Sequence, residues 1–186
     1  MKFNKKTRSN LITLLIIGVF IFPTSREWIQ RQIAFIPSVD DIEDRPVLDS
    51  MNWFLIDESG KRINFSSMKG KVVFVNFWAT WCPPCRAELP YLQEFYDDYK
   101  DQMEFVFISS EDKVIVDEFL EKEGYELPTF QLGSAPPIYF QESNALPSSY
   151  IIDKQGRVAV FKTGAGRWSS SFFYRKLNRL INDPKP

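Results

Sequence analysis

The residues of this chain best suited to chemistry are two cysteines, Cys82 and Cys85. They are the only cysteines in a chain of 186 residues, only two residues separate them, and the chain has no histidine. A pair at this spacing can alternate between a dithiol and a disulfide, and such exchange needs no cofactor. The pattern predicts thiol-disulfide exchange in which Cys82 is the nucleophile and Cys85 the resolving thiol.

Two other interpretations of the pair are open on residue types alone. A zinc site needs about four ligands, and only carboxylates could complete the set here. A purely structural disulfide would close a loop too small to stabilise the fold much. Both are disfavoured against redox chemistry, so no metal and no cofactor is predicted.

The elements expected around the pair place it at the start of a helix. Residues 72–79, VVFVNFWA, are typical of a buried central strand. Residues 86–100 carry apolar side chains at helical spacing. A helix N-terminus offers free N–H groups and a positive dipole end, and both favour the thiolate of Cys82.

Pro83 and Pro84 limit this effect, because neither can donate an N–H to the sulfur of Cys82. The nearest remaining donors are the N–H groups of Cys85 and Arg86. The helix dipole alone contributes ~0.3 to 1 kcal/mol, which is less than one pKa unit at about 1.36 kcal/mol per unit. We therefore hypothesise a moderately acidic Cys82, typical of a reductant or isomerase. A thiolate titration with a pKa of about 4 would contradict this hypothesis.

The segment that contains the pair resembles a known family. Residues 75–90, VNFWATWCPPCRAELP, are similar to the active-site segment of TlpA-like and ResA-like extracytoplasmic thiol-disulfide oxidoreductases of the thioredoxin superfamily. The resemblance extends loosely over residues 52–181, including a hairpin at 54–65 and ALPSSYIIDKQGRV at 145–158. It implies an α/β, thioredoxin-like fold: a central mixed β-sheet flanked by helices, with an added N-terminal hairpin.

Glu88 is the third catalytic candidate that the resemblance implies. It lies three residues after Cys85, one helical turn on, and in the family the equivalent carboxylate helps to move protons at the thiols. A partly buried carboxyl group would have the raised pKa that suits this task. The chain has Asn76 where thioredoxin has an aspartate, so Glu88 is the substitute base. The alternative is an acidic residue that merely complements the helix dipole.

The resemblance also implies a docking surface for client proteins. Pro147 corresponds to the family's cis-proline, although sequence alone would predict an ordinary trans residue. Its loop would bind an extended client segment beside Cys82 by strand-type hydrogen bonds. Leu146, Trp81, Pro83 and Pro84 complete the predicted docking residues. Trp81 could alternatively just cover the helix end.

The rest of the chain fits the same layout. Pro90 predicts a kink in one continuous helix, with a separate second helix as the alternative. The GAG sequence at 164–166 lacks a strand-turn-helix setting and indicates a turn, not a nucleotide site. The further elements expected are a strand at 103–109, a helix from 110–112 to about 124, a loop with a short element at 132–143, a hairpin of strands at 148–153 and 157–162, and a helix at 168–182.

Composition and charge agree with a single domain at residues 45–186. A hydrophobic content of 44%, with 16% aromatic residues, suffices for a packed core, so most phenylalanines are expected to be packing residues. The net charge of −1, without a basic block beyond the N-terminus, argues against nucleic-acid binding.

The N-terminus predicts export. Lys2, Lys5, Lys6 and Arg8 precede an apolar stretch at 11–22, followed by no small-x-small cleavage site. We expect an uncleaved signal anchor at 1–25 with the domain outside the cell membrane, or alternatively a secreted protein after cleavage. Residues 26–44 are expected to be a tether that lies on the membrane surface or packs on the domain.

Together these features predict an enzyme on the extracytoplasmic (periplasmic) face of the membrane that reduces or exchanges disulfides in exported client proteins. The resemblance implies a membrane electron-donor protein as a second partner and apocytochrome c as a candidate client. The rival hypothesis is a thioredoxin-like binding module whose CxxC pair only regulates docking. A copper chaperone is disfavoured, because this chain has no histidine to serve as the copper ligand. A thiol peroxidase is disfavoured, because the cysteines of this chain do not lie in the threonine-containing motif of such enzymes.

Overall fold

The computed structural model describes residues 37, 45–143 and 145–183. The predicted anchor at 1–25 lies outside the described residues, as does the predicted tether at 26–44 except for Pro37. No helix in the described part of the chain is long and apolar enough to cross a membrane.

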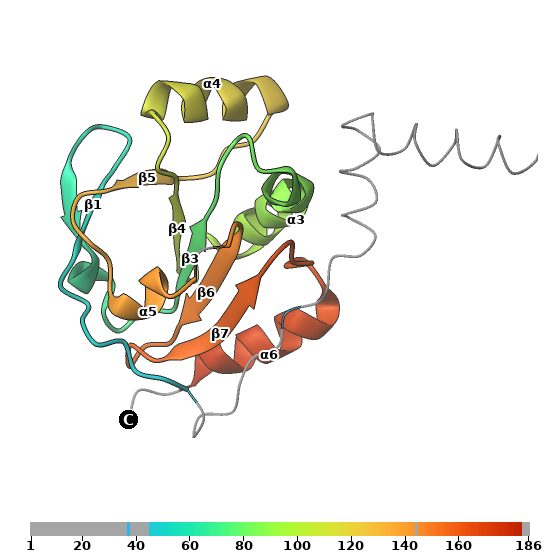
Figure 1. The fold of residues 1–186 in the computed structure, drawn as a ribbon. Coiled ribbons are helices and arrows are strands. Elements are labelled where there is room, and N and C mark those ends of the chain that lie inside the picture. Colours follow the sequence, from blue (N-terminus) through green and yellow to red (C-terminus); the bar gives the residue numbers. More distant parts are fainter. Residues whose placement is uncertain (1–36, 38–44, 144, 184–186) are drawn as a thin grey trace, which may run out of the picture.

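Strands and helices alternate through most of the described chain (Figure 1). In chain order they are β1 (Phe54–Ile56), β2 (Arg62–Asn64), the 3-10 helix η2 (Phe65–Met68), β3 (Val73–Phe77), α3 (Pro83–Tyr99), β4 (Glu104–Ile108), α4 (Lys113–Glu123), β5 (Thr129–Leu132), α5 (Ile138–Gln141), β6 (Ser148–Ile152), β7 (Val158–Thr163) and α6 (Ser171–Asn182).

Within the described residues the strands form one mixed sheet in the order β2-β1-β5-β4-β3-β6-β7. Strand β3 is central, parallel to β4 and antiparallel to β6, and the hairpin β1–β2 joins the sheet through β5. The register places Phe77 opposite Ser148. The end of β3, which leads to Cys82, therefore lies beside the start of β6, which follows Pro147.

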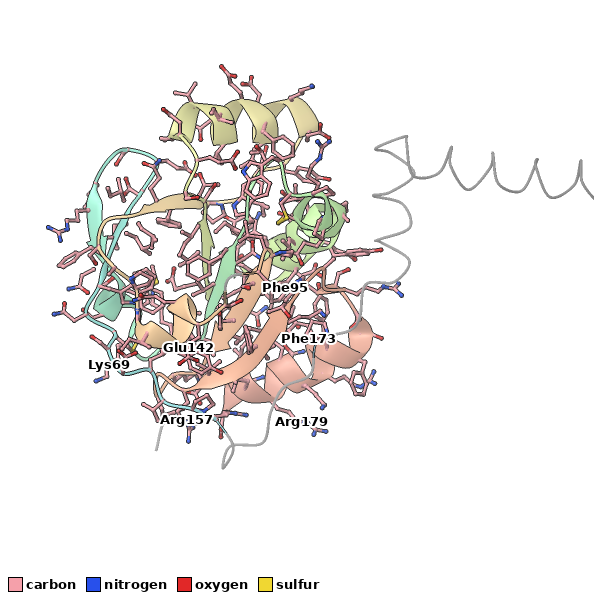
Figure 2. All side chains as sticks on the ribbon, viewed as in Figure 1. Lys69, Phe95, Glu142, Arg157, Phe173 and Arg179 are labelled. Carbon is pink, nitrogen blue, oxygen red and sulfur yellow. A yellow bond between two sulfur atoms is a disulfide. The ribbon has the colours of Figure 1, made fainter. Side chains whose placement is uncertain are left out.

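Side chains alternate between the two faces of the sheet and pack into two hydrophobic cores, one on each face. Phe74 belongs to the core under α3, α4 and α6, whereas its neighbours Val73 and Val75 belong to the core with η2 and α5. Phe95 of α3 and Phe173 of α6 pack edge to face, with ring centroids 5.6 Å apart. Figure 2 labels both residues. This aromatic layer supports the helix that begins at the cysteine pair.

The structure confirms the mixed sheet flanked by helices, the added N-terminal hairpin and one continuous helix through Pro90. One element was not anticipated, and the start of one helix was wrong by three residues. Strand β5 was not anticipated, and the last helix begins at Ser171, not at Trp168. Ser170 caps this helix by accepting a hydrogen bond from the N–H of Phe173. Trp168 thus lies before the helix, and its side chain is fully buried in the core.

Candidate redox site

Cys82 and Cys85 are joined by a disulfide at the N-terminus of α3, with their Cα atoms 5.3 Å apart. Cys82 is the N-cap residue, and Pro83 and Pro84 form the first helical positions, where a missing N–H costs no intrahelical bond. The N–H of Cys85 donates to the sulfur of Cys82 at 3.3 Å. This bond confirms one of the two donors expected to remain after the prolines.

The disulfide lies just beneath the surface. Cys82 is 3% exposed and Cys85 1%, so the predicted nucleophile is the more accessible of the two. Trp81 is 69% exposed, Pro83 is exposed and Pro84 is half-buried. The residues on either side of Cys82 in the chain thus present apolar groups to solvent, and we call them the apolar rim.

The predicted docking loop comes directly before β6, whose first residue, Ser148, pairs with Phe77 at the end of β3. The peptide bond between Leu146 and Pro147 is cis, as the resemblance implied. Pro147 is buried, and its carbonyl accepts a hydrogen bond from the N–H of Gly164 at 2.9 Å. Leu146 is half-buried and packs against the core cluster that contains both cysteines. The fold thus brings together residues that stand more than sixty positions apart in the sequence.

Glu88 is fully buried on the inner face of α3, one turn after Cys85. Its Oε1 accepts a hydrogen bond from Asn76 Nδ2 at 3.0 Å. Its Oε2 accepts from the N–H of Gly166 at 3.0 Å and from Trp168 Nε1 at 3.2 Å. A carboxyl group held from three directions is not simply an acidic residue in an exposed first turn of a helix.

Burial raises the pKa of Glu88 from its ordinary value of 4.5 to about 7. The three hydrogen bonds and the positive charge of Lys162 oppose this rise, because each stabilises the carboxylate. The outcome is a group that can both bind and release a proton near neutral pH. This property is what general acid-base chemistry at a thiol needs.

Sequence reasoning missed two of these donors, Gly166 and Trp168. The GAG segment was expected to be a turn; the chain bends at Gly164, and the last residue of the segment, Gly166, donates to Glu88. A Cβ atom at Gly166 would lie 2.6 Å from Trp168 Nε1, so a side chain there would displace the indole. The sequence shows only a glycine followed two positions later by a tryptophan. This pattern is too general to identify the two residues as donors to Glu88.

Asn76 links Glu88 to the sheet. Its Nδ2 also donates to Ser149 Oγ on β6 at 2.8 Å, and all three side chains are buried. Its Oδ1 has no hydrogen-bond partner among the described residues. The amide group of Asn76 thus donates both of its hydrogen bonds, one to Glu88 and one to Ser149. Donation to Glu88 suits the ionised carboxylate, which can only accept.

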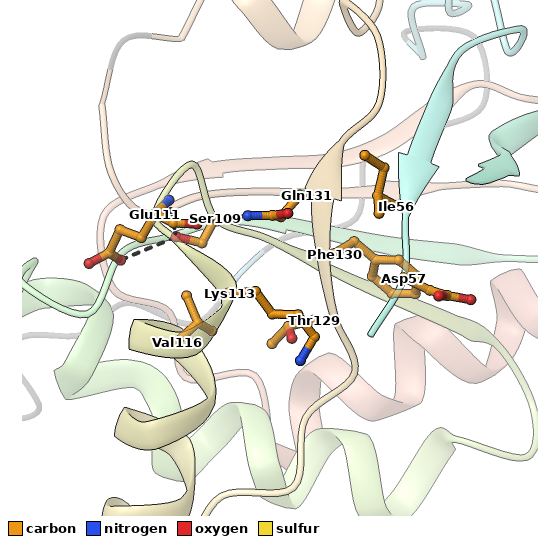
Figure 3. A pocket seen from close by; sticks show the side chains of 9 residues that line it. All are labelled: Ile56, Asp57, Ser109, Glu111, Lys113, Val116, Thr129, Phe130 and Gln131. Carbon is orange, nitrogen blue, oxygen red and sulfur yellow. Dashed lines mark hydrogen bonds between the residues drawn. The ribbon is translucent and has the colours of Figure 1, made fainter. Parts of the chain in front are cut away.

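A second carboxylate, that of Glu111, holds the loop before Cys82. Glu111, between β4 and α4, accepts from the Thr80 N–H at 2.7 Å and from Thr80 Oγ1 at 2.6 Å. Ser109 Oγ donates to the same carboxylate at 3.2 Å, as Figure 3 shows at the start of α4. Because Thr80 stands two residues before Cys82, these bonds anchor the active-site loop to the end of β4.

We expect Thr80→Val to lower the free energy of unfolding of the oxidised protein by about 1–2 kcal/mol, because it removes a hydrogen bond to a carboxylate without changing the shape of the side chain. Thr80→Ser keeps the hydroxyl and is the matched control. Urea denaturation of both variants measures the difference. Equal losses in the two variants would show that the hydroxyl bond contributes nothing.

The described residues hold no group of three or more histidine, cysteine or acidic side chains arranged to bind a metal ion. The site as described consists of a disulfide, a buried carboxyl group and an apolar rim. Such groups can exchange disulfides and move protons.

Residues 48–161 match the sequence profile of the AhpC/TSA family. The chain belongs to the AhpC/TSA family. The matched range runs from the segment before β1 into β7, so it includes the cysteine pair, Glu88 and Pro147.

Among curated proteins, this AhpC/TSA member is similar to the thiol-disulfide oxidoreductase ResA of Bacillus subtilis (strain 168), at 36% identity over 118 residues, 62% of this chain and 66% of that protein. It is 35% identical to the protein of the same name from Bacillus anthracis, over 59% of this chain and 65% of that protein. The alignments thus span slightly less than two thirds of these relatives. They confirm the resemblance to ResA-like proteins.

Solved structures confirm the thioredoxin-like fold of this family member. A putative thiol:disulfide interchange protein DsbE from Chlorobium tepidum superposes with a TM-score of 0.62 at 20% identity, covering 75% of this chain and 99% of that one. StoA from Bacillus subtilis superposes with a TM-score of 0.51 at 23% identity, covering 61% and 87%. At these identities the likeness concerns the fold alone.

Proposed function

We propose that this protein is an extracytoplasmic thiol-disulfide oxidoreductase that reduces or exchanges disulfides in exported proteins through Cys82 and Cys85. The observation that carries the proposal is the disulfide at the start of α3. The strand before it, β3, ends at Phe77, which pairs with Ser148, the residue after Pro147. ResA relatives named as thiol-disulfide oxidoreductases support it.

The electrons balance over two steps. In the reduced protein the Cys82 thiolate attacks one sulfur of a client disulfide, so that a mixed disulfide forms and the other client sulfur leaves as a thiolate. The Cys85 thiolate then attacks the Cys82 sulfur and releases the second client sulfur. Two electrons pass to the client, and the protein is left in the disulfide form that the structure describes.

Glu88 serves the second step. Cys85 is 1% exposed, so its thiol must lose a proton where water has little access. Residues three apart on a helix are neighbours, and the pKa of about 7 makes Glu88 an acceptor for that proton. The hydrogen bonds from Asn76, Gly166 and Trp168 keep the carboxyl group in place during the transfer.

The proposal includes a location and two partners. The basic and apolar N-terminus supports an anchor at 1–25 with the domain on the outer face of the membrane, or secretion after cleavage. That compartment is oxidising, so a membrane electron-donor protein must restore the dithiol. Apocytochrome c is a candidate client through the resemblance to ResA-like proteins.

Reduction of insulin by the full-length protein, with dithiothreitol as electron source, tests the activity. We expect Cys82→Ser to abolish the rate above the dithiothreitol background, because the attacking sulfur is gone. Cys85→Ser is the matched variant: it retains the first attack and should accumulate mixed disulfides with clients in cells, identifiable by mass. A Cys82→Ser rate equal to that of the unaltered protein would sink the proposal and favour the binding-module hypothesis.

A further inference from the structure

A row of three polar residues crosses the sheet beneath Glu88. Asn76 on β3 stands opposite Ser149 on β6, and Ser149 stands opposite Lys162 on β7. Residues directly opposite each other in neighbouring strands point to the same face. Since Asn76 bonds Glu88, Lys162 faces the same layer as the buried carboxyl group.

This face of the sheet is otherwise apolar. Phe74, Ile151 and Val160 are buried there, two residues along each strand from the polar row. Lys162 is half-buried on the edge strand β7, and burial lowers the pKa of its ammonium group while the charge of Glu88 opposes that effect. A cation is costly in such a layer unless an anion compensates it.

Four cations on α3, on α6 and before α6 have other partners. Arg86 on α3 pairs with Glu123 at 3.8 Å, and the Arg167 guanidinium lies 5.8 Å from the Tyr91 ring. On α6, Arg175 and Lys176 lie over the ring of Phe172. The groups that bond Glu88 are neutral, and Cys85 does not titrate while it is in the disulfide. The positive charge of Lys162 does act on Glu88, because it opposes the rise in the pKa of that carboxyl group.

We propose that Lys162 is the counter-charge of Glu88, a positioning residue that sets the proton occupancy of this carboxyl group from the edge of the sheet. This inference deepens the proposed function, on which its role in turnover rests. Lys162 stabilises the carboxylate in addition to the three hydrogen bonds, each of which has a larger effect on the pKa of Glu88. Without this charge the carboxyl group would hold its proton to higher pH and be a poorer acceptor for Cys85.

The test is the titration of the Glu88 side-chain carboxyl by carbon-13 NMR in the oxidised full-length protein, with the signal assigned by its loss in Glu88→Gln. We expect Lys162→Gln to move the midpoint upward by about one pH unit. Lys162→Arg keeps the charge and should leave the midpoint near that of the unaltered protein. Lys69→Gln removes an exposed lysine on the far side of the molecule, labelled in Figure 2, and should also leave it unchanged.

An unmoved midpoint in Lys162→Gln, or an equal shift in Lys69→Gln, would overturn the inference. If Lys162→Gln fails to fold, a shifted midpoint in Lys162→Arg would overturn it and an unchanged one would support it. The measurement uses oxidised protein without a client, so it is independent of disulfide reduction. A titration result that contradicts the role of Lys162 would therefore not contradict the proposed disulfide reduction, which Cys82→Ser tests. Likewise, a failed insulin-reduction test would not change the titration result.

Discussion

Replacing Trp168 with alanine is expected to lower the free energy of unfolding by about 3–5 kcal/mol. The indole is fully buried, and its ring centroid lies 4.9 Å from that of Phe74 and 5.4 Å from that of Phe173. Gly166 also lies close to the indole, since a Cβ atom there would be 2.6 Å from Nε1. Truncation would leave a cavity that rings packed this tightly cannot close, and it would remove one donor from the buried Glu88 carboxyl group.

Trp168→Phe separates these two contributions, because it retains most of the ring and removes the Nε1 donor. We expect it to cost about 1–3 kcal/mol, the range for a hydrogen bond to a charged group, and to raise the pKa of Glu88 further. Trp81→Ala is the matched surface control, expected within about 0.5 kcal/mol of the unaltered protein. Urea denaturation of the oxidised proteins measures the free energy of unfolding of each variant. A Trp168→Ala loss no larger than that of Trp81→Ala would show that the aromatic layer does not depend on the indole.

The parts of the site that could be predicted from sequence are residues that lie close together in the chain. Cys82, Cys85 and Glu88 lie within seven residues, so strand-helix periodicity and the helical repeat were enough to place them together. Pro147 was placed only through the family resemblance, since composition alone gives a cis bond little weight.

The parts that were missed depend on long-range contacts. Gly166 and Trp168 stand 78 and 80 residues from the glutamate that they bind. Glu111 stands 31 residues from Thr80. No local periodicity encodes such pairs, because they meet only after the sheet has assembled. The row from Asn76 to Lys162 likewise needs the register of three strands, which a single sequence does not specify.

The missed strand β5 has a similar explanation. It contains only the four residues Thr129–Leu132, of which Thr129 is buried and Leu132 is exposed. Its pairing is parallel to β4 and antiparallel to β1. These partners stabilise a segment whose own alternation is too short to be distinguished from a loop. The resemblance supplied the hairpin at 54–65 but not the strand that joins it to the sheet.

Glu88→Gln should remove a pH dependence of stability that the unaltered protein shows between pH 4.5 and 7. The pKa of Glu88 is raised from 4.5 to about 7 in the folded protein, so over this interval the folded state binds more protons than the unfolded state. The free energy of unfolding therefore falls as pH rises, by about 3 kcal/mol across the interval. Glutamine does not titrate, so its curve should lack this fall.

Urea denaturation of both proteins at several pH values between 4.5 and 8 measures the effect, with Glu121→Gln on the exposed face of α4 as the matched control. Parallel curves for Glu88→Gln and the unaltered protein would mean that folding does not raise the pKa of Glu88. The stability effect and the catalytic role can be separated, because burial alone produces the first. If Glu88 also accepts the Cys85 proton, the pH dependence of insulin reduction near pH 7 should disappear in Glu88→Gln, whereas a merely structural carboxyl group would leave that profile in place.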